Sequence, residues 1–127
     1  MIVKTKLHDV NWFYNLNWRD ILCVQQDADY QIIDTKNGPL RVYATMETTL
    51  SMFPQLTRAH RSWLINLHEL QGYAPNSEDQ SVMLFFKNGV IKKIGRGRTF
   101  YDQFVEDFTA LSNNSEIYNS ISHGNRI

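Results

Sequence analysis

The stretch TRAHRSWLINL, from Thr57 to Leu67, decides the fold. It sets a cationic, hydrogen-bonding cluster, Arg58 and His60-Arg61-Ser62, directly before the apolar run Trp63-Leu64-Ile65. We expect the apolar run to anchor the segment in the core. Because a guanidinium is rarely fully buried without a partner, Arg61 should then project outward from a rigid base. A rigid base matters because specific contacts need positions held to within roughly 0.5 Å.

Enzymatic chemistry at this segment is not expected. Ser62 lacks a Gly-x-Ser-x-Gly turn or an equivalent strained turn that would make it a nucleophile. His60 and His68 are eight residues apart, and His8 and His123 lie near the ends of the chain, so no metal cluster is predicted. Two readings stay open for His60, a buried imidazole that satisfies backbone groups or a surface contact, and Ser62 could simply tie a turn. We therefore expect no catalytic residue, no metal and no cofactor.

Length and charge set limits on the kind of protein. The chain has 127 residues, which suits one compact domain, and its net charge is zero. The charge is unevenly spread, because residues 36–98 contain nine cations and four anions, a net charge of +5, balanced by −5 in the flanks. Such an asymmetry is typical of an anionic partner, although ordinary surface scatter would also produce it.

The cellular setting is predicted from absences. Cys23 is the only cysteine, which excludes an internal disulfide framework and fits a reducing compartment. No stretch approaches the roughly 20 apolar residues of a membrane span, and the first residues contain no apolar signal core. The sequence therefore predicts a soluble, cytoplasmic protein without a membrane partner.

Turn signals organise a mainly β chain. Asn37-Gly38 and Asn88-Gly89 each predict a β-hairpin, because Asn-Gly readily takes the positive φ angles of a tight primed turn. Pro39 has no N–H to donate, so it should begin its strand or lie on an edge. The expected strands are 30–35 with 40–43, 81–86 with 90–94, 21–24, and the less marked patterns 2–5 and 12–16.

Helical periodicity occurs in two places. Met46, Leu50 and Phe53 predict a short helix, with Thr45 as N-cap and Pro54 closing it. From Phe100 to Leu111 an apolar stripe with a period of 3.6 residues predicts a longer helix, with Thr99 as N-cap. The polar segment 112–127 is expected to be a mobile tail.

A second basic cluster precedes the longer helix. Lys92, Lys93, Arg96 and Arg98 are interleaved with Gly95 and Gly97. Arginines at a helix N-terminus oppose the helix dipole, but together with free N–H groups they suit a phosphate, and arginine can also contact a guanine edge bidentately. A flexible cationic loop without a ligand is the alternative.

The residues resemble a known family. Phe53 followed by His60-Arg61-Ser62-Trp63-Leu64-Ile65-Asn66, after Asp20-Ile-Leu and Asp29-Tyr30 and before a hairpin, a basic loop and a helix, is similar to the LytTR DNA-binding domain. The resemblance covers about residues 2–111, so the expected DNA-binding domain is 1–111 and the tail 112–127 lies outside it. It implies an elongated β-sandwich of short strands, with one short internal helix and a C-terminal helix, that binds promoter DNA through loops.

The resemblance also implies the contacts. Arg61 and Arg96 are the expected base readers, and two copies on paired repeats, as a homodimer on DNA, are expected. Gln25 and Gly95 depart from the family pattern, which affects detailed specificity. The expected DNA-binding residues are Arg61, Arg96, His60, Ser62, Arg98, Lys93, Tyr30 and Gln31.

The predicted function is therefore sequence-specific binding of duplex DNA, as a transcriptional regulator or as the output domain of a response regulator in a two-component system. Any receiver domain is expected outside this chain, unless another signal is used. Two alternatives remain. A single-strand binder would expose aromatic side chains, for which Tyr30, Tyr43 and Tyr73 are available. A protein-interaction module would not require the +5 segment.

Overall fold

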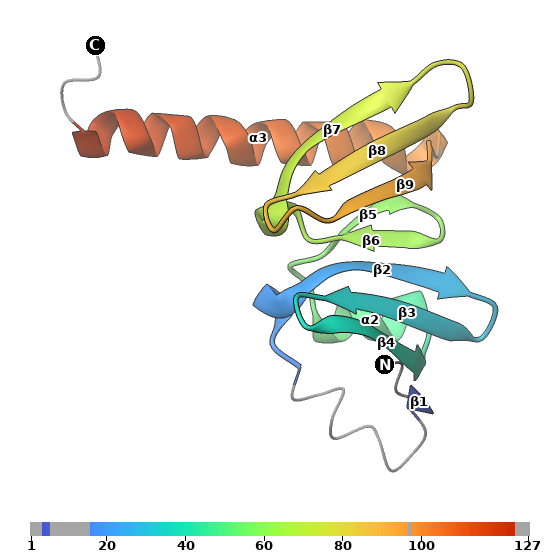
Figure 1. The fold of residues 1–127 in the computed structure, drawn as a ribbon. Coiled ribbons are helices and arrows are strands. Elements are labelled where there is room, and N and C mark those ends of the chain that lie inside the picture. Colours follow the sequence, from blue (N-terminus) through green and yellow to red (C-terminus); the bar gives the residue numbers. More distant parts are fainter. Residues whose placement is uncertain (1–3, 6–15, 97, 124–127) are drawn as a thin grey trace.

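The computed structural model describes residues 4–5, 16–96 and 98–123 (Figure 1). Two β-sheets stack on one another, a short helix covers the outer face of the larger sheet, and a long helix packs beside the smaller sheet. This confirms the predicted mainly β class with two helices. In the described part of the chain, neither helix is long and apolar enough to cross a membrane.

The larger sheet has the strand order β1-β4-β3-β2-β6-β5. Its pairs are antiparallel except β1 with β4, which run parallel. The strand pattern at 2–5 corresponds in part to β1, whereas the pattern at 12–16 lies outside the described residues apart from Leu16. The strands are β1 (Lys4–Thr5), β2 (Ile21–Asp27), β3 (Tyr30–Thr35), β4 (Gly38–Tyr43), β5 (Thr57–His60) and β6 (Trp63–Ile65).

The smaller sheet is an antiparallel meander in the order β7-β8-β9. Short 3-10 helices, η2 (Trp18–Asp20) and η3 (Leu67–Glu69), lead into β2 and β7. The strands are β7 (Leu70–Asn76), β8 (Ser81–Phe86) and β9 (Ile91–Gly95).

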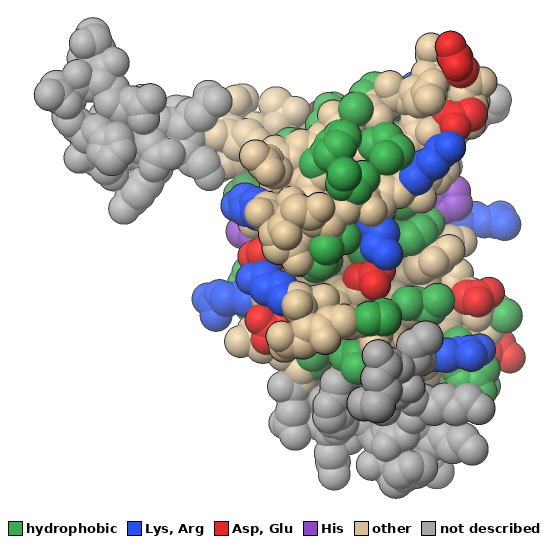
Figure 2. Space-filling view, viewed as in Figure 1, with side chains coloured by type: hydrophobic (Ala, Val, Ile, Leu, Met, Phe, Trp, Pro, Cys, Tyr) green, Lys and Arg blue, Asp and Glu red, His purple; other side chains and the backbone are tan. Residues whose placement is uncertain are grey.

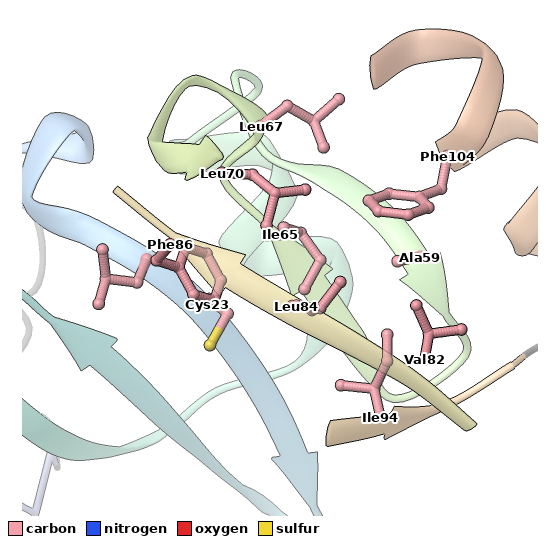
Figure 3. Close-up of a cluster of buried hydrophobic side chains, with 11 residues drawn as sticks. Cys23, Ala59, Ile65, Leu67, Leu70, Val82, Leu84, Phe86, Ile94 and Phe104 are labelled. Atoms are coloured by element: carbon pink, nitrogen blue, oxygen red, sulfur yellow. The ribbon is translucent and has the colours of Figure 1, made fainter. Parts of the chain in front are cut away.

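The central strands β2 and β6 of the larger sheet are buried on both faces, which explains their continuous apolar runs. Successive residues of a strand point to opposite faces, so the fully buried Leu64 and Ile65 enter different cores. Ile65 joins the first core, between the two sheets and the long helix, with Phe86 and Phe104 (Figure 3). Leu64 joins the second core with Ile33, Val42 and residues of the short helix. The predicted anchor of the Thr57–Leu67 stretch is confirmed for Leu64 and Ile65, and Trp63 is partly buried against the first core.

The two Asn-Gly hairpins are confirmed, but their turn type is not the predicted one. Gly38 and Gly89 have positive φ angles of 118° and 92°, whereas Asn37 and Asn88 do not have positive φ. A primed turn with Asn-Gly at its centre needs positive φ at both residues. In the first hairpin Thr35 pairs with Gly38, so Asn37 is the second central residue and the glycine follows the turn. Only the glycine requires the left-handed conformation.

The helices match the prediction in position and differ at one end. α2 (Met46–Met52) begins after Thr45, whose side chain accepts a hydrogen bond from the Thr48 N–H at 3.2 Å, so this N-cap is confirmed. α3 (Arg98–His123) begins before Thr99, so the prediction of Thr99 as its N-cap is wrong. α3 also continues through the polar segment as far as His123. The mobility of that segment stays a prediction.

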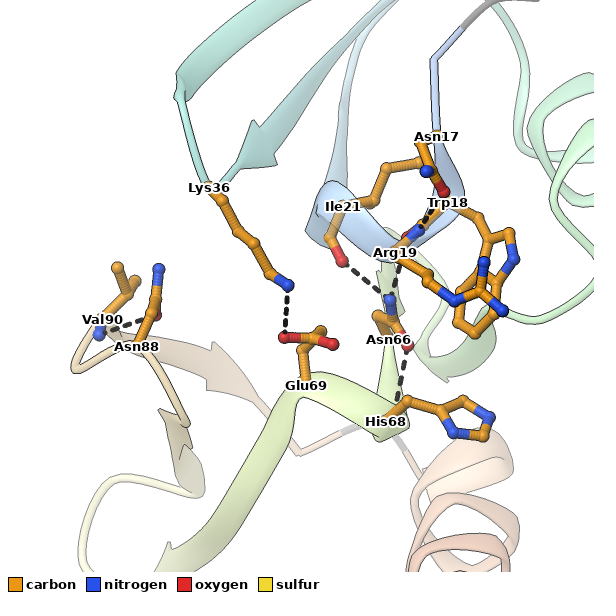
Figure 4. Close-up of polar contacts among 10 residues, drawn as sticks. All are labelled: Asn17, Trp18, Arg19, Ile21, Lys36, Asn66, His68, Glu69, Asn88 and Val90. Atoms are coloured by element: carbon orange, nitrogen blue, oxygen red, sulfur yellow. Dashed lines mark hydrogen bonds and ion pairs between the residues drawn. The ribbon is translucent and has the colours of Figure 1, made fainter.

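Asn66 ties the two halves of the larger sheet together. Its fully buried side chain donates to the carbonyl oxygens of Trp18 and Ile21 at 3.0 and 2.8 Å and accepts from the His68 N–H at 3.1 Å (Figure 4). One side chain therefore fixes the start of β2 against the end of β6.

Candidate nucleic-acid interface

Three turns between strands and the loop between β9 and α3 lie at one edge of the molecule. These are the β2–β3, β5–β6 and β7–β8 turns and the β9–α3 loop, all on the right in Figure 1. We call this edge the turn row. The Asn-Gly turns lie at the opposite edge. The sequence clusters around Arg61 and Arg96, which are far apart in the chain, both belong to the turn row.

Direct contacts join the members of the turn row. The Gln26 N–H at the end of β2 donates to the Ser62 carbonyl oxygen at 2.8 Å. His60 lies against Gly95, where a Cβ atom would be only 3.3 Å from the imidazole Nε2. The Arg96 N–H donates to the Gln80 carbonyl oxygen at 3.0 Å. The row is thus one continuous surface and not a set of independent loops.

Arg61 is exposed at the β5–β6 turn, as predicted. Its backbone is held from both sides, because Arg58 Nη2 donates to the Arg61 carbonyl oxygen at 2.7 Å and the Ser62 N–H donates to His60 Nδ1 at 3.1 Å. The strand register shifts between Arg58 and His60, as in a β-bulge, and bulges re-aim side chains. A rigid backbone with an outward arginine is the geometry that base recognition needs.

His60 is held in the neutral state. Burial lowers the pKa of its imidazole below the usual range, and the neighbouring Arg61 and Arg58 charges lower it further. Neutrality is also what its hydrogen bond requires, since Nδ1 accepts a hydrogen bond from the Ser62 N–H and therefore cannot itself carry a proton. His60 therefore supports the turn, and its ring is partly exposed beside Arg61.

Arg96 is oriented by the β7–β8 turn. Its Nη2 donates to Gln80 Oε1 at 2.6 Å, and its guanidinium carbon lies 5.9 Å from the centre of the Tyr101 ring. Gln80 adopts a positive φ of 56°, which a non-glycine residue seldom takes without a reason. The sequence offers no local sign of this role for Gln80, because the two residues meet only through the pairing of β8 with β9.

The start of α3 suits an anion. Arg98 is its first residue, and the first turn contains no acidic side chain that would neutralise the helix dipole. The side chain of Arg98 is not among those that the structure describes, so its contact with DNA stays a prediction.

Some cations of the +5 segment are already paired. Lys93 Nζ lies 2.7 Å from Asp79 Oδ2, and Lys93 and Ser81 hold the pKa of Asp79 at about 2, so the carboxylate is ionised at neutral pH. Lys92 Nζ lies 2.9 Å from Asp34 Oδ2, a pair that joins the two sheets. The Lys93 side chain is 58% exposed and stays accessible to a phosphate, whereas the Lys92 pair is more enclosed.

The β2–β3 turn separates two neighbouring predictions. Tyr30 lies at the surface, with the Arg41 guanidinium carbon 4.2 Å from its ring centre and Tyr43 packed edge to face. Gln31 is fully buried, and its side chain bonds Gln26 and Thr49. The prediction that Gln31 contacts DNA is therefore wrong for this conformation. The alternation of the strand could have signalled this, since Gln31 shares a face with the buried Ile33.

Among the residues that the structure describes, the aromatic side chains do not form a broad stacking platform. Tyr43 is 60% exposed, but Tyr73 packs against the first core and contacts the rings of Tyr101, Phe104 and Phe108. Tyr73 is thus not available for base stacking. This weakens the single-strand alternative, which needs several exposed rings on one strand face.

The charge pattern of the turn row is mixed. In Figure 2, Lys, Arg and His side chains lie along the right edge with acidic side chains above and below them. Within the described residues, no group of three His, Cys, Asp or Glu side chains could hold a metal ion. The surface offers hydrogen-bond donors and positive charge, which are the groups that contact phosphates and base edges.

Comparisons with known proteins agree with this geometry. The family model of the LytTr DNA-binding domain matches residues 11–109. The chain belongs to the LytTR DNA-binding domain family. Among solved structures, the fold is similar to the LytTr DNA-binding domain of a Bacillus cereus protein described as a methyl-accepting/DNA response regulator. The match has a TM-score of 0.59 at 12% identity and covers 72% of this chain and 83% of that one. The comparison with curated proteins gave no match. The function of this LytTR domain is DNA binding in transcription regulation.

Proposed function

We propose that this LytTR domain binds duplex DNA in a sequence-specific manner, with Arg61 and Arg96 reading base edges from adjacent positions in the turn row. The observation that carries the proposal is the exposed Arg61 on a turn whose backbone is bonded on both sides. Arginine reads guanine through paired contacts to O6 and N7, which demand a fixed direction of approach. A loosely held arginine would supply charge without sequence preference.

Other residues of the turn row supply the remaining contacts. Tyr30 at the β2–β3 turn provides a third contact, supported by its surface position beside Arg41. Lys93 and Arg98 meet phosphates, as does the N-terminus of α3. Ser62 lies beside Arg61 and contributes a contact through its hydroxyl, because its backbone N–H and carbonyl oxygen are already bonded to His60 and Gln26. Because Lys93 is paired with Asp79, binding a phosphate requires it to exchange partners.

The regulatory setting is part of the proposal. We propose that the domain acts as a transcriptional regulator or as the DNA-binding output domain of a response regulator, and that two copies bind paired repeats. The similar Bacillus cereus protein is described as a methyl-accepting/DNA response regulator, which supports this setting. Two copies on one site would double the number of base pairs that are read. One small domain alone reads too few base pairs to distinguish a promoter from other sites.

The experiment is to select bound duplexes from a random library and then titrate the selected site and its single-base variants. Arg61→Ala and Arg96→Ala should each cost about 1 to 3 kcal/mol and remove the preference at one base pair. Arg19→Ala is the matched control, because Arg19 is an exposed arginine in η2, which leads into the start of β2, at the edge opposite the turn row (Figure 1). Equal losses on every sequence would demote both arginines to phosphate contacts.

Two further measurements separate the alternatives. Affinity for the selected duplex should fall steeply with salt, because phosphate contacts release counterions. A single strand of the same sequence should bind more weakly than the duplex. Stronger binding of the single strand would favour a stacking mode, and the number of chains bound per selected site tests the paired-repeat proposal.

A further inference from the structure

We infer that Arg58 and His60, although they belong to the cationic cluster, are positioning residues that brace the Arg61 turn against the Arg96 loop. This inference rests on the proposed function. It assigns to both residues a role different from direct contact with DNA, and it adds Phe100 as the surface on which the brace rests.

Arg58 is committed to the protein. Its Nη2 donates to the Arg61 carbonyl oxygen at 2.7 Å, and its guanidinium carbon lies 4.7 Å from the centre of the Phe100 ring. Its Nε atom is buried and has no hydrogen-bond partner. A buried donor without a partner costs free energy, and such an exception in a native structure calls for an explanation. Bracing explains it, because the guanidinium lies over the Phe100 ring while its Nη2 atom holds the Arg61 turn.

His60 repeats the arrangement from the other side of Ala59. Its Nδ1 accepts from the Ser62 N–H, and its ring lies against Gly95. Ala59, between the two, is 1% exposed and belongs to the first core. β5 therefore buries Ala59, and Arg58 and His60 on either side of it both bond the Arg61 turn. Arg58 also contacts Phe100, and His60 contacts Gly95, so the two contacts lie on either side of Arg96 in the chain.

The consequence is mechanical. Gly95 immediately precedes Arg96, and Phe100 lies in the first turn of α3, so the two contacts fix both ends of the Arg96 loop. Arg61 and Arg96 cannot then move independently. Two arginines that read separate base pairs must be held at one spacing, and Arg58 and His60 set that spacing.

The test is a double-mutant cycle on the selected duplex. Arg58→Lys keeps the positive charge but loses the planar group that spans Phe100 and the Arg61 carbonyl. We expect it to weaken binding about tenfold, to reduce the preference at the base pair read by Arg61, and to leave the salt dependence unchanged. In the Arg61→Ala background the same substitution should cause almost no further loss, because Arg58 acts through Arg61.

A direct phosphate contact by Arg58 gives different results. Lysine would then replace arginine with little loss, and removing the charge with Arg58→Gln would weaken binding equally in both backgrounds and lower the salt slope by about one. Those results would overturn the inference. Lys93→Ala is the matched control, since a phosphate contact should be additive with Arg61→Ala.

Folding and the proposed function are checked separately. Circular dichroism and melting identify variants that do not fold. Phe100→Leu provides a second route, because it leaves Arg58 in place, removes the ring beneath it, and should reproduce the loss of base preference. If the unaltered protein shows no base preference, the proposed function fails. If it shows a preference that Arg61→Ala removes but neither Arg58→Lys nor Phe100→Leu alters, only the brace is wrong.

Discussion

Replacing Asn66 with alanine should destabilise the domain by about 3 kcal/mol. The substitution removes three side-chain hydrogen bonds of the fully buried Asn66. The Ile21 carbonyl oxygen, which is buried, and the Trp18 carbonyl oxygen and His68 N–H, which are partly buried, lose these partners (Figure 4). Each hydrogen bond contributes about 1 kcal/mol net, and unpaired buried groups add to the loss. For a domain of this size the melting temperature should fall by roughly 10 °C.

The assay is chemical denaturation of both proteins, with the slope compared as well as the midpoint. Asn88→Ala is the matched control, because Asn88 is exposed and its side chain accepts only the Val90 N–H at 3.1 Å. The control should lose less than about 1 kcal/mol. If Asn66→Ala is no more costly than the control, the Asn66 side chain is not needed, and the backbone pairing of β2 with β6 and the packing around it suffice.

Asn66→Asp sharpens the same test. A carboxylate has no N–H to donate and would face two carbonyl oxygens, so this variant should be less stable than Asn66→Ala at neutral pH. Desolvation and the carbonyl oxygens would raise the pKa of the aspartate in the folded state. The protonated acid would then regain one donor, so the penalty should be smallest below the unfolded-state pKa, grow as pH rises from there through the folded-state pKa, and be complete above it. A penalty that does not change with pH would contradict this account.

Three further outcomes are expected. Because the pKa of His60 is lowered in the folded state, its contribution to stability should be complete above about pH 6.5 and be lost as pH falls through the folded-state pKa; His60→Asn, which has no titrating ring, should remove this component from the pH profile of melting. Lys92→Ala should cost more stability than Lys93→Ala in urea titrations, because Asp34 is more enclosed than the exposed partner of Lys93, and only Lys93→Ala should lower the salt slope of DNA binding. Deleting 112–127 should leave the melting temperature and DNA affinity almost unchanged, and a large drop in either would show that the polar end of α3 contributes to the fold.

Local patterns predicted the elements, and long-range contacts explain what was missed. The Asn-Gly hairpins and the Thr45 N-cap depend on residues a few positions apart, so the sequence suffices for them. The parallel pairing of β1 with β4 has no such local sign. Asn66 was recognised only as part of a motif, because its partners lie 45 and 48 residues earlier in the chain.

The predictions of site residues were also right where they rested on local patterns and wrong where they depended on long-range packing. Arg61 was expected to be exposed because an apolar anchor follows it, and the anchor is buried. Gln31 was assigned to the surface because it follows Tyr30 in a turn signal, although strand alternation places it inward. Arg58 was counted only as one cation of the +5 segment, since a sequence shows a charge but not the ring over which it lies.

The strands β2 and β6 separate the two hydrophobic cores, so sequence changes in one core should affect the other core little. The brace and the Arg96 loop are attached to the core that contains Phe104, whereas α2 packs on the other side with Ile33 and Val42. Volume changes beneath α2 can be absorbed there without shifting the arginine pair, because close-packed layers transmit strain mainly to direct neighbours. Evolutionary drift should therefore be freer on the α2 side. A library randomised at α2-facing positions is the natural starting point for engineering stability while target preference is kept.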